Sequence, residues 1–232
     1  MEFLHNGYTL EIPEGSFPLS TDTMTLAGFV KLPRNAQVLD LCSGCGSIGL
    51  LLCADRPDCH VTGIELDPNA HAAALRNIAA NGLEGRMSSI CADINNISEL
   101  IPAGKFQYCV SNPPYFSSGP QSQNLPLARR DDGCSMDALL RAAAWGLKFG
   151  GDFFVVHRPE RLAELCCCAS AHKLEPKRLC LLRHKEGGPV SLILLQCRKG
   201  GKPGLLWEEA ALFTSQGTPT SYYHSIYHTQ GG

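Results

Sequence analysis

The chain has 232 residues, with 20 lysines and arginines against 22 aspartates and glutamates, and a formal net charge of -2. Its length fits one domain, and the 44% of hydrophobic residues is enough to bury a sizeable core. The near-neutral balance excludes binding to polyanions by overall charge alone, so a nucleic-acid partner requires a local basic patch.

Short runs rich in β-branched residues alternate along the chain with alanine- and leucine-rich stretches. This alternation predicts an α/β domain with a mostly parallel sheet. We expect seven strands, at residues 37–41, 60–65, 86–92, 106–111, 152–157, 178–182 and 190–197. We expect helices at residues 47–54, 68–81, 135–147 and 159–172, with a long polar loop at 117–130 and an irregular tail after residue 214.

The amino terminus and the cysteines bear on where the protein works. The first residues carry Glu2, Glu11 and Glu14 and no basic, apolar leader, so we expect no signal peptide. The 12 cysteines are too few for a disulfide scaffold, and we expect free thiols in a reducing cytoplasm. No apolar run reaches the roughly 18 residues of a membrane span, so no membrane association is expected.

A glycine-rich loop follows the first predicted strand. Gly44, Gly46 and Gly49 match the pattern G-x-G-x-x-G between a strand and a helix, and Glu65 ends the next strand. A glycine turn lets a helix N-terminus approach a ligand closely, and a carboxylate at this spacing can bind the two hydroxyls of a ribose. The pattern therefore predicts an adenosine-containing cofactor.

Two aspartates indicate which cofactor this is. Asp40 lies at the mouth of the glycine loop, where a carboxylate repels phosphate and favours the ammonium or sulfonium of S-adenosylmethionine. Asp93 follows the third predicted strand, where it either accepts a hydrogen bond from an adenine amine or caps a helix. We predict no metal site, because Cys42 and Cys45 lie inside the glycine loop and no second pair with zinc-like spacing accompanies them.

The fourth predicted strand runs into Asn112-Pro113-Pro114-Tyr115. Ligands of an open parallel sheet bind at the carboxyl ends of its strands, so this tetrapeptide is expected to face the same crevice as the glycine loop. The alternative is an ordinary turn built from asparagine and proline.

Together, Asp40, Gly44, Gly46, Glu65, Asp93 and the tetrapeptide resemble the class I S-adenosylmethionine-dependent methyltransferases that modify planar nitrogens. Residues 17–227 resemble the bacterial tRNA1(Val) (adenine-37-N6)-methyltransferase family, with support from residues 17–23 and 199–205. The resemblance implies a Rossmann-like, seven-stranded, mostly parallel sheet with helices on both faces. It also implies that a methyl group passes to the N6 amine of an adenine beside the anticodon, leaving S-adenosylhomocysteine. The resemblance further implies that Thr21, Asp22, Leu66, Ile94 and Asn112 bind the cofactor.

The tetrapeptide suits this reaction chemically. An exocyclic adenine amine is a poor nucleophile because its lone pair is delocalised into the ring. The side-chain oxygen of Asn112 and the carbonyl of Pro113 can accept its two hydrogens, while Pro114 keeps the segment rigid. Tyr115 offers a face for base stacking, which contributes about 1–3 kcal/mol.

Residues 173–202 contain eight basic side chains against two acidic ones. They form either a phosphate-binding surface for tRNA or a solvated sheet edge. Tyr222, Tyr223 and Tyr227 either stack on RNA or lie on a carboxyl-terminal strand that packs on the core. The sequence does not predict an oligomeric state.

The chain is expected to be a single domain, in which residues 1–35 form a strand-and-turn extension over the cofactor site and residues 36–232 form the Rossmann-like core. This short extension disfavours a protein glutamine N-methyltransferase, since those enzymes carry a helical recognition domain there. An rRNA guanine or adenine N-methyltransferase and a DNA adenine methyltransferase remain as alternatives. An NAD-dependent oxidoreductase would leave residues 112–115 unused, and a non-catalytic RNA-binding module would leave the glycine loop unexplained.

Overall fold

The computed structural model describes residues 2–4, 7–13, 19–114 and 134–229. Tyr115 and the predicted loop at 117–130 lie outside these residues. Nothing in the described part of the chain is a helix long and apolar enough to cross a membrane.

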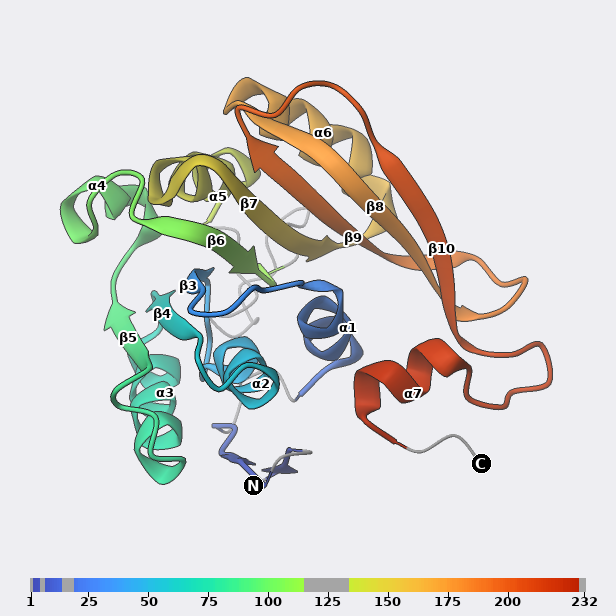
Figure 1. Ribbon diagram of the computed structural model, residues 1–232, viewed down its shortest axis with the longest axis horizontal. Helices are drawn as coiled ribbons and strands as arrows, with labels where there is room; N and C mark the ends of the chain where they lie inside the picture. Colours follow the sequence, from blue (N-terminus) through green and yellow to red (C-terminus); the bar gives the residue numbers. More distant parts are fainter. Residues whose placement is uncertain (1, 5–6, 14–18, 115–133, 230–232) are drawn as a thin grey trace, which may run out of the picture.

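One large sheet of eight strands forms the centre of the molecule (Figure 1). Its spatial order is β10-β8-β9-β7-β6-β3-β4-β5. Neighbouring strands run parallel except that β9 is antiparallel to both β7 and β8. In chain order the strands are β3 (Gln37–Leu41), β4 (His60–Glu65), β5 (Met87–Cys91), β6 (Phe106–Ser111), β7 (Leu147–His157), β8 (Leu174–Lys185), β9 (Val190–Lys199) and β10 (Leu206–Phe213).

The seven predicted strands are therefore all present, and β10 is an eighth that the sequence did not predict. A separate two-stranded sheet near the amino terminus pairs β1 (Glu2–Phe3) with β2 (Thr9–Leu10).

Helices cover both faces of the large sheet, as the resemblance implies (Figure 1). The longer helices are α1 (Thr21–Phe29), α2 (Ser47–Asp55), α3 (Pro68–Ala80), α5 (Met136–Gly146), α6 (Leu162–Ala171) and α7 (Ser221–Tyr227). Shorter turns are η1 (Ile94–Asn96), α4 (Ile97–Leu100) and η3 (Pro159–Arg161).

Two hydrophobic cores lie on opposite sides of this sheet. One is shared with α1, α2, α3 and α7, and the other with α4, α5 and α6. Successive side chains of a strand point to opposite faces, so Phe153 packs into the second core and Phe154 into the first. Both rings are almost fully buried, and burial of such a side chain contributes about 1.5–3 kcal/mol.

The carboxyl terminus corrects one expectation of the sequence. Tyr222, Tyr223 and Tyr227 lie on a helix, α7, and not on a strand, because Thr220 caps the segment by accepting a hydrogen bond from the Tyr223 amide. The rings of Tyr223 and Tyr227 stack with their centroids 4.4 Å apart, and all three tyrosines pack against the first core. Their stacking on RNA stays a prediction.

The order of the strands creates the place where a ligand can bind. From β3 the chain continues outward to β4 and β5, whereas from the adjacent β6 it continues in the opposite direction to β7. The loops that follow β3 and β6 therefore diverge at the carboxyl end of the sheet, and a ligand-binding crevice is expected between them.

Candidate active site

The glycine loop between β3 and α2 forms one wall of this crevice. Gly44 and Gly46 have φ angles of +57° and +85°, in the left-handed region that glycine adopts without strain. A Cβ on Gly46 or Gly49 would lie 2.8 Å or 2.5 Å from the Cε atom of Met87 on β5. The predicted glycine pattern thus serves both the turn and the close packing of α2 on the sheet.

Cys42 opens the same loop with a φ of +58°, which is unusual for a residue with a side chain. This conformation costs about 1–2 kcal/mol in a non-glycine residue. Its Sγ lies 3.9 Å from the Sγ of Cys134, and hydrogen bonding to Cys134 and burial raise the pKa of the Cys42 thiol. No three metal-binding side chains converge in the described ranges.

Glu65 ends β4 beside the glycine loop, as its spacing predicted. Its Oε2 accepts a hydrogen bond from the Gly44 amide at 2.7 Å, and its Oε1 accepts one from the Asp67 amide at 2.9 Å. Burial raises the pKa of this carboxyl, while the two amides partly offset that effect. Each oxygen keeps a second lone pair, so the carboxylate can still accept hydrogen bonds from a diol.

Asp40 lies in β3 between Gly63 of β4 and Val110 of β6 and has no solvent exposure. Neither of its carboxylate oxygens forms a hydrogen bond of normal length and angle with a described residue. Burial, and then the charge of Glu65, raise the pKa of Asp40 well above its usual value, and the backbone amide of Gly49 partly offsets that rise. A buried acid with so little compensation is costly, and a cation held beside the loop would reduce that cost.

Asp93 follows β5 and caps η1. Its Oδ1 accepts hydrogen bonds from the backbone and side-chain amides of Asn95, at 2.8 and 2.9 Å. The helix-cap alternative is therefore present in the structure, and the adenine contact stays a prediction. Nearby, Leu66 is 47% exposed after β4, whereas Ile94 is buried at the start of η1. The Ala92 amide donates to the Glu65 carbonyl at 2.9 Å and joins these two strand ends.

Asn112 and Pro113 follow β6 on the other wall of the crevice. The Ser111 hydroxyl donates to the Leu41 carbonyl at 2.7 Å, which fixes the end of β6 against the end of β3. The Nδ2 of Asn112 donates to the Thr23 Oγ1 at 3.2 Å. This bond leaves the Asn112 Oδ1 as an acceptor for a ligand. Pro113 is buried and Pro114 is half-buried.

Thr23, which the sequence did not mark as part of the site, is the third residue of α1. Ser20 caps this helix by accepting a hydrogen bond from the Thr23 amide. The predicted residues Thr21 and Asp22 directly precede Thr23 and form no described bond with Asn112. Burial raises the pKa of Asp22. The one available signal was the placement of Thr23 within the segment 17–23 that carries part of the family resemblance.

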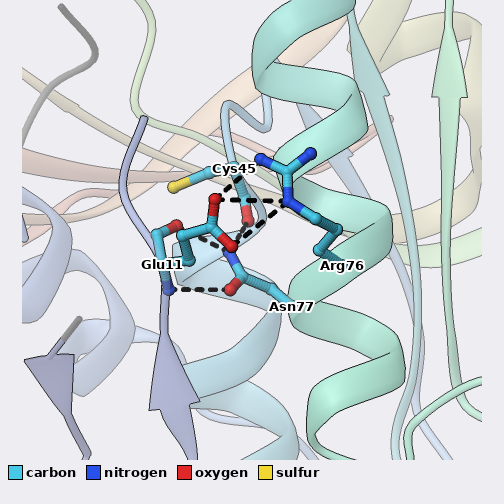
Figure 2. A network of polar contacts seen from close by, with 4 residues as sticks. All are labelled: Glu11, Cys45, Arg76 and Asn77. Atoms are coloured by element: carbon cyan, nitrogen blue, oxygen red, sulfur yellow. Dashed lines mark hydrogen bonds and ion pairs between the residues drawn. The ribbon is translucent and has the colours of Figure 1, made fainter. Parts of the chain in front are cut away.

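The amino-terminal segment docks on α3 beside the glycine loop. In Figure 2, Asn77 of α3 lies between Glu11 and the loop residue Cys45, and its Nδ2 donates to the carbonyls of both, at 2.9 and 3.0 Å. The Glu11 amide donates back to the Asn77 Oδ1 at 2.7 Å, and the Glu11 carboxylate pairs with Arg76. The segment 1–35, predicted to be strand and turn, therefore reaches the loop through α3, but it also contains the helix α1 because Ser20 caps residues 21–29. Its position over a bound cofactor stays a prediction.

The predicted basic segment is spread along both ends of the sheet. Lys199 donates to the carbonyls of Ala144 and Leu147, and Arg198 pairs with Asp152, at the amino end of β7. Arg178 lies over the Phe29 ring. The basic residues near the carboxyl end of β8 are Arg183 and Lys185.

The methyltransferase small domain matches residues 20–165, which include β3, the glycine loop, β6 and Asn112. The chain belongs to the methyltransferase small domain family. The match begins at the cap of α1, so the helix that contacts Asn112 is part of the family's domain.

Several relatives of this methyltransferase carry one name, tRNA1(Val) (adenine(37)-N6)-methyltransferase. The protein from Shewanella halifaxensis is 31% identical over 182 residues, which cover 78% of this chain and 72% of its own. That from Vibrio parahaemolyticus is 31% identical over 85% of this chain and 82% of its own. That from Bacteroides fragilis is 29% identical over 83% and 82%.

Solved structures confirm the methyltransferase fold. A predicted O-methyltransferase from Agrobacterium tumefaciens superposes with a TM-score of 0.75 at 19% identity, over 90% of this chain and 96% of its own. A geranyl diphosphate C-methyltransferase from Streptomyces coelicolor gives 0.55 at 11% identity, over 75% and 76%. At these identities the likeness concerns the fold alone.

Proposed function

We propose that this methyltransferase transfers a methyl group from S-adenosylmethionine to the N6 amine of adenine 37 in tRNA1(Val). The observation that carries the proposal is the Asn112 side chain, which is held by Thr23 so that its oxygen remains available at the crevice. The shared name of the relatives, over most of this chain, supports the choice of substrate.

The residues around the glycine loop fit the methyl donor. We assign Glu65 to the ribose hydroxyls, Asp93 and Leu66 to the adenine, and the backbone of Gly44 and Gly46 to close approach of the donor. When bound, the donor supplies a methyl group that its sulfonium has already activated. The reaction therefore requires alignment of an amine more than a strong base.

The same fit extends to the methionine end of the donor. Asp40 is buried in β3, the strand that leads into the glycine loop, and a cation bound at the loop would favour the charged form of its carboxyl. Thr21 and Asp22 begin α1, the helix that reaches Asn112, and we assign them to this end. Ile94 supports the adenine side from the second core.

At the substrate, two acceptors act on the adenine amine. We assign them as the Asn112 Oδ1 and the Pro113 carbonyl. As they accept the two hydrogens, the lone pair of the nitrogen localises and turns toward the methyl group. Thr23 matters because an amide oriented the other way would present a donor to the amine and oppose binding. Tyr115 is assigned to stacking on the base, and Pro114 to holding this segment rigid.

We infer that the tRNA binds at the carboxyl end of the sheet. There an unpaired loop base can enter the crevice without the free-energy cost of breaking a base pair. Within the basic segment 173–202, Arg183 and Lys185 lie at that end, and the exposed Arg158 follows the parallel strand β7. We assign the phosphate contacts to these side chains. A tRNA substrate places the enzyme in the cytoplasm.

The test offers labelled S-adenosylmethionine to tRNA, ribosomal RNA and protein from a strain that lacks the enzyme, and products are identified by mass. We expect N6-methyladenosine in one tRNA with wild-type protein and none with Asn112→Ala. Label on glutamine would assign the protein to the glutamine N-methyltransferases, and label in ribosomal RNA would replace the tRNA. Failure to bind the methyl donor would overturn the proposal entirely.

A further inference from the structure

Two asparagines bind the backbone of the amino-terminal segment: Asn77 in the last turn of α3, and Asn81, the residue that caps the carboxyl end of that helix. Asn81 accepts a hydrogen bond from the Thr9 amide and donates to the Thr9 carbonyl, both at 2.8 Å. Asn77 forms the corresponding pair with Glu11, at 2.7 and 2.9 Å. Each side-chain amide thus bonds the main chain as a neighbouring strand does.

Only Asn77 of this pair also touches the glycine loop (Figure 2). The second hydrogen of its Nδ2 is directed at the Cys45 carbonyl, 3.0 Å away, and the side chain is 2% exposed. Both Nδ2 hydrogens and the Oδ1 are then in use within the protein. A buried amide with all these bonds formed is rigid and costly to replace.

The hydrogen bond from Asn77 to Cys45 is one of three that fix the backbone of the glycine loop from Gly44 to Gly46. The Gly44 amide donates to Glu65, and the Gly46 amide donates to the Ser43 carbonyl at 3.0 Å. The peptide between Cys45 and Gly46 is thus held at its carbonyl by Asn77 and at its N–H by Ser43. Its orientation determines the surface that the loop presents to a ligand.

We propose that Asn77 is a positioning residue for the methyl-donor site, and that it makes the amino-terminal segment a support of the glycine loop. This inference rests on the proposed function, because the ligand of the loop is taken to be S-adenosylmethionine. Asn77 acts through Cys45 and does not itself touch the reacting atoms.

A purely structural role makes a different prediction from a positioning role. If Asn77 only anchors the segment 9–11, then Asn77→Ala and Asn81→Ala must affect the protein alike, since each loses two bonds to the segment. If Asn77 also fixes the conformation of the glycine loop, then only Asn77→Ala must weaken cofactor binding, and Asn81→Ala must not.

The experiment measures the Kd of S-adenosylhomocysteine by calorimetry, together with the thermal midpoint and the split between kcat and KM. We expect Asn77→Ala to raise this Kd and the KM for S-adenosylmethionine about 10-fold, the loss of one buried hydrogen bond. Asn81→Ala and Arg76→Ala should stay within about twofold of wild type in both quantities, although their thermal midpoints fall. The kcat of every variant at saturating donor should stay within about twofold.

Equal Kd values for Asn77→Ala and Asn81→Ala would overturn the proposal. Should Asn77→Ala fold poorly, Asn77→Leu serves instead, because it fills a similar volume, forms none of these hydrogen bonds and places no charge against the Glu11 and Cys45 carbonyls. The same comparison then decides the result. Wild-type protein that binds no S-adenosylhomocysteine would count against the proposed function first, so the two failures are distinguishable.

Discussion

The two walls of the crevice are built in different ways. On the β3–β4 side, the glycine loop is held by hydrogen bonds with the Glu65 carboxylate, the Ser43 backbone carbonyl and the Asn77 side-chain amide. On the β6 side, the described residues hold the Asn112 side chain by one bond, to Thr23. The first wall would bind the same cofactor at every turnover, and the second would receive a base from a large RNA.

This difference predicts which wall of the crevice tolerates the substitution of one residue. A loop held at several points loses affinity gradually when one contact is removed. A side chain oriented by a single bond loses its function when either partner is changed. Substitutions on the β3–β4 side should therefore change mainly the affinity for the cofactor, and substitutions on the β6 side should change mainly kcat.

The largest expected effect follows from removing the acceptor itself. Asn112→Ala should lower kcat at least about 100-fold, because the amine loses the group that aligns it. The Kd of S-adenosylhomocysteine, measured by calorimetry, should remain within about twofold. An equal loss of binding would place Asn112 on the cofactor wall and contradict the comparison.

On the first wall, Glu65→Ala should raise the Kd of S-adenosylhomocysteine about 30-fold. It removes the carboxylate that holds the Gly44 and Asp67 amides and that is assigned to the ribose, and a bond to a charged group contributes about 1.5–3 kcal/mol. Glu65→Gln, which keeps one acceptor, should lie between the variant and wild type. A kcat defect at saturating donor without a change in Kd would contradict this assignment.

A smaller effect tests the orientation of Asn112. Thr23→Val keeps the shape of the side chain but removes its hydroxyl acceptor, so kcat should fall about 10-fold. Thr23→Ser should restore most of the rate. The matched control is Thr25→Val on the same helix, whose buried hydroxyl donates to the Asp22 carbonyl and not to Asn112. If both valine variants lose the same activity, Thr23 serves only to stabilise α1.

The smallest expected effect concerns stability. The pKa of Asp40 is raised in the folded protein, so the folded state binds a proton more tightly than the unfolded chain does. Stability without cofactor should therefore fall as pH rises from about 4 through the raised pKa of Asp40. Asp40→Asn should lack this component and melt at least about 2 °C higher at pH 8. Matched melting curves at pH 5 and pH 8 provide the measurement, and a lower midpoint of the variant at pH 8 would contradict the prediction.

Much of the fold could be predicted because periodicity marks buried strands. The strand β10 escaped prediction since its first four residues, beginning at Leu206, are all exposed and carry no apolar alternation. It forms by pairing with β8, which is a contact between distant segments. The tyrosines at residues 222–227 suggested a strand because tyrosine has a high β-propensity. The segment forms a helix instead, because the Thr220 cap outweighs that propensity.

The positions of the proposed site residues were predictable wherever a residue type and its place at a strand end were enough. Gly44, Glu65 and Asn112 lie where the sequence placed them, and their roles remain predictions. Thr23 and Asn77 do not, since each acts through a partner 89 or 32 residues away, and nothing in the local sequence marks a buried threonine or asparagine as part of a network. Their roles emerge only when the packing of α1 and α3 is known.

The position of α1 has a consequence for how the protein matures. The helix packs against α7, and the Tyr227 hydroxyl lies 3.5 Å from the Thr21 Oγ1 across 206 residues of sequence. During synthesis α1 leaves the ribosome long before α7 exists, and chains lengthen at about 5–20 residues per second. The helix that orients Asn112 thus lacks this support for at least about ten seconds of translation. The contact between α1 and α7 should therefore be among the last to form, after the glycine loop is already in place.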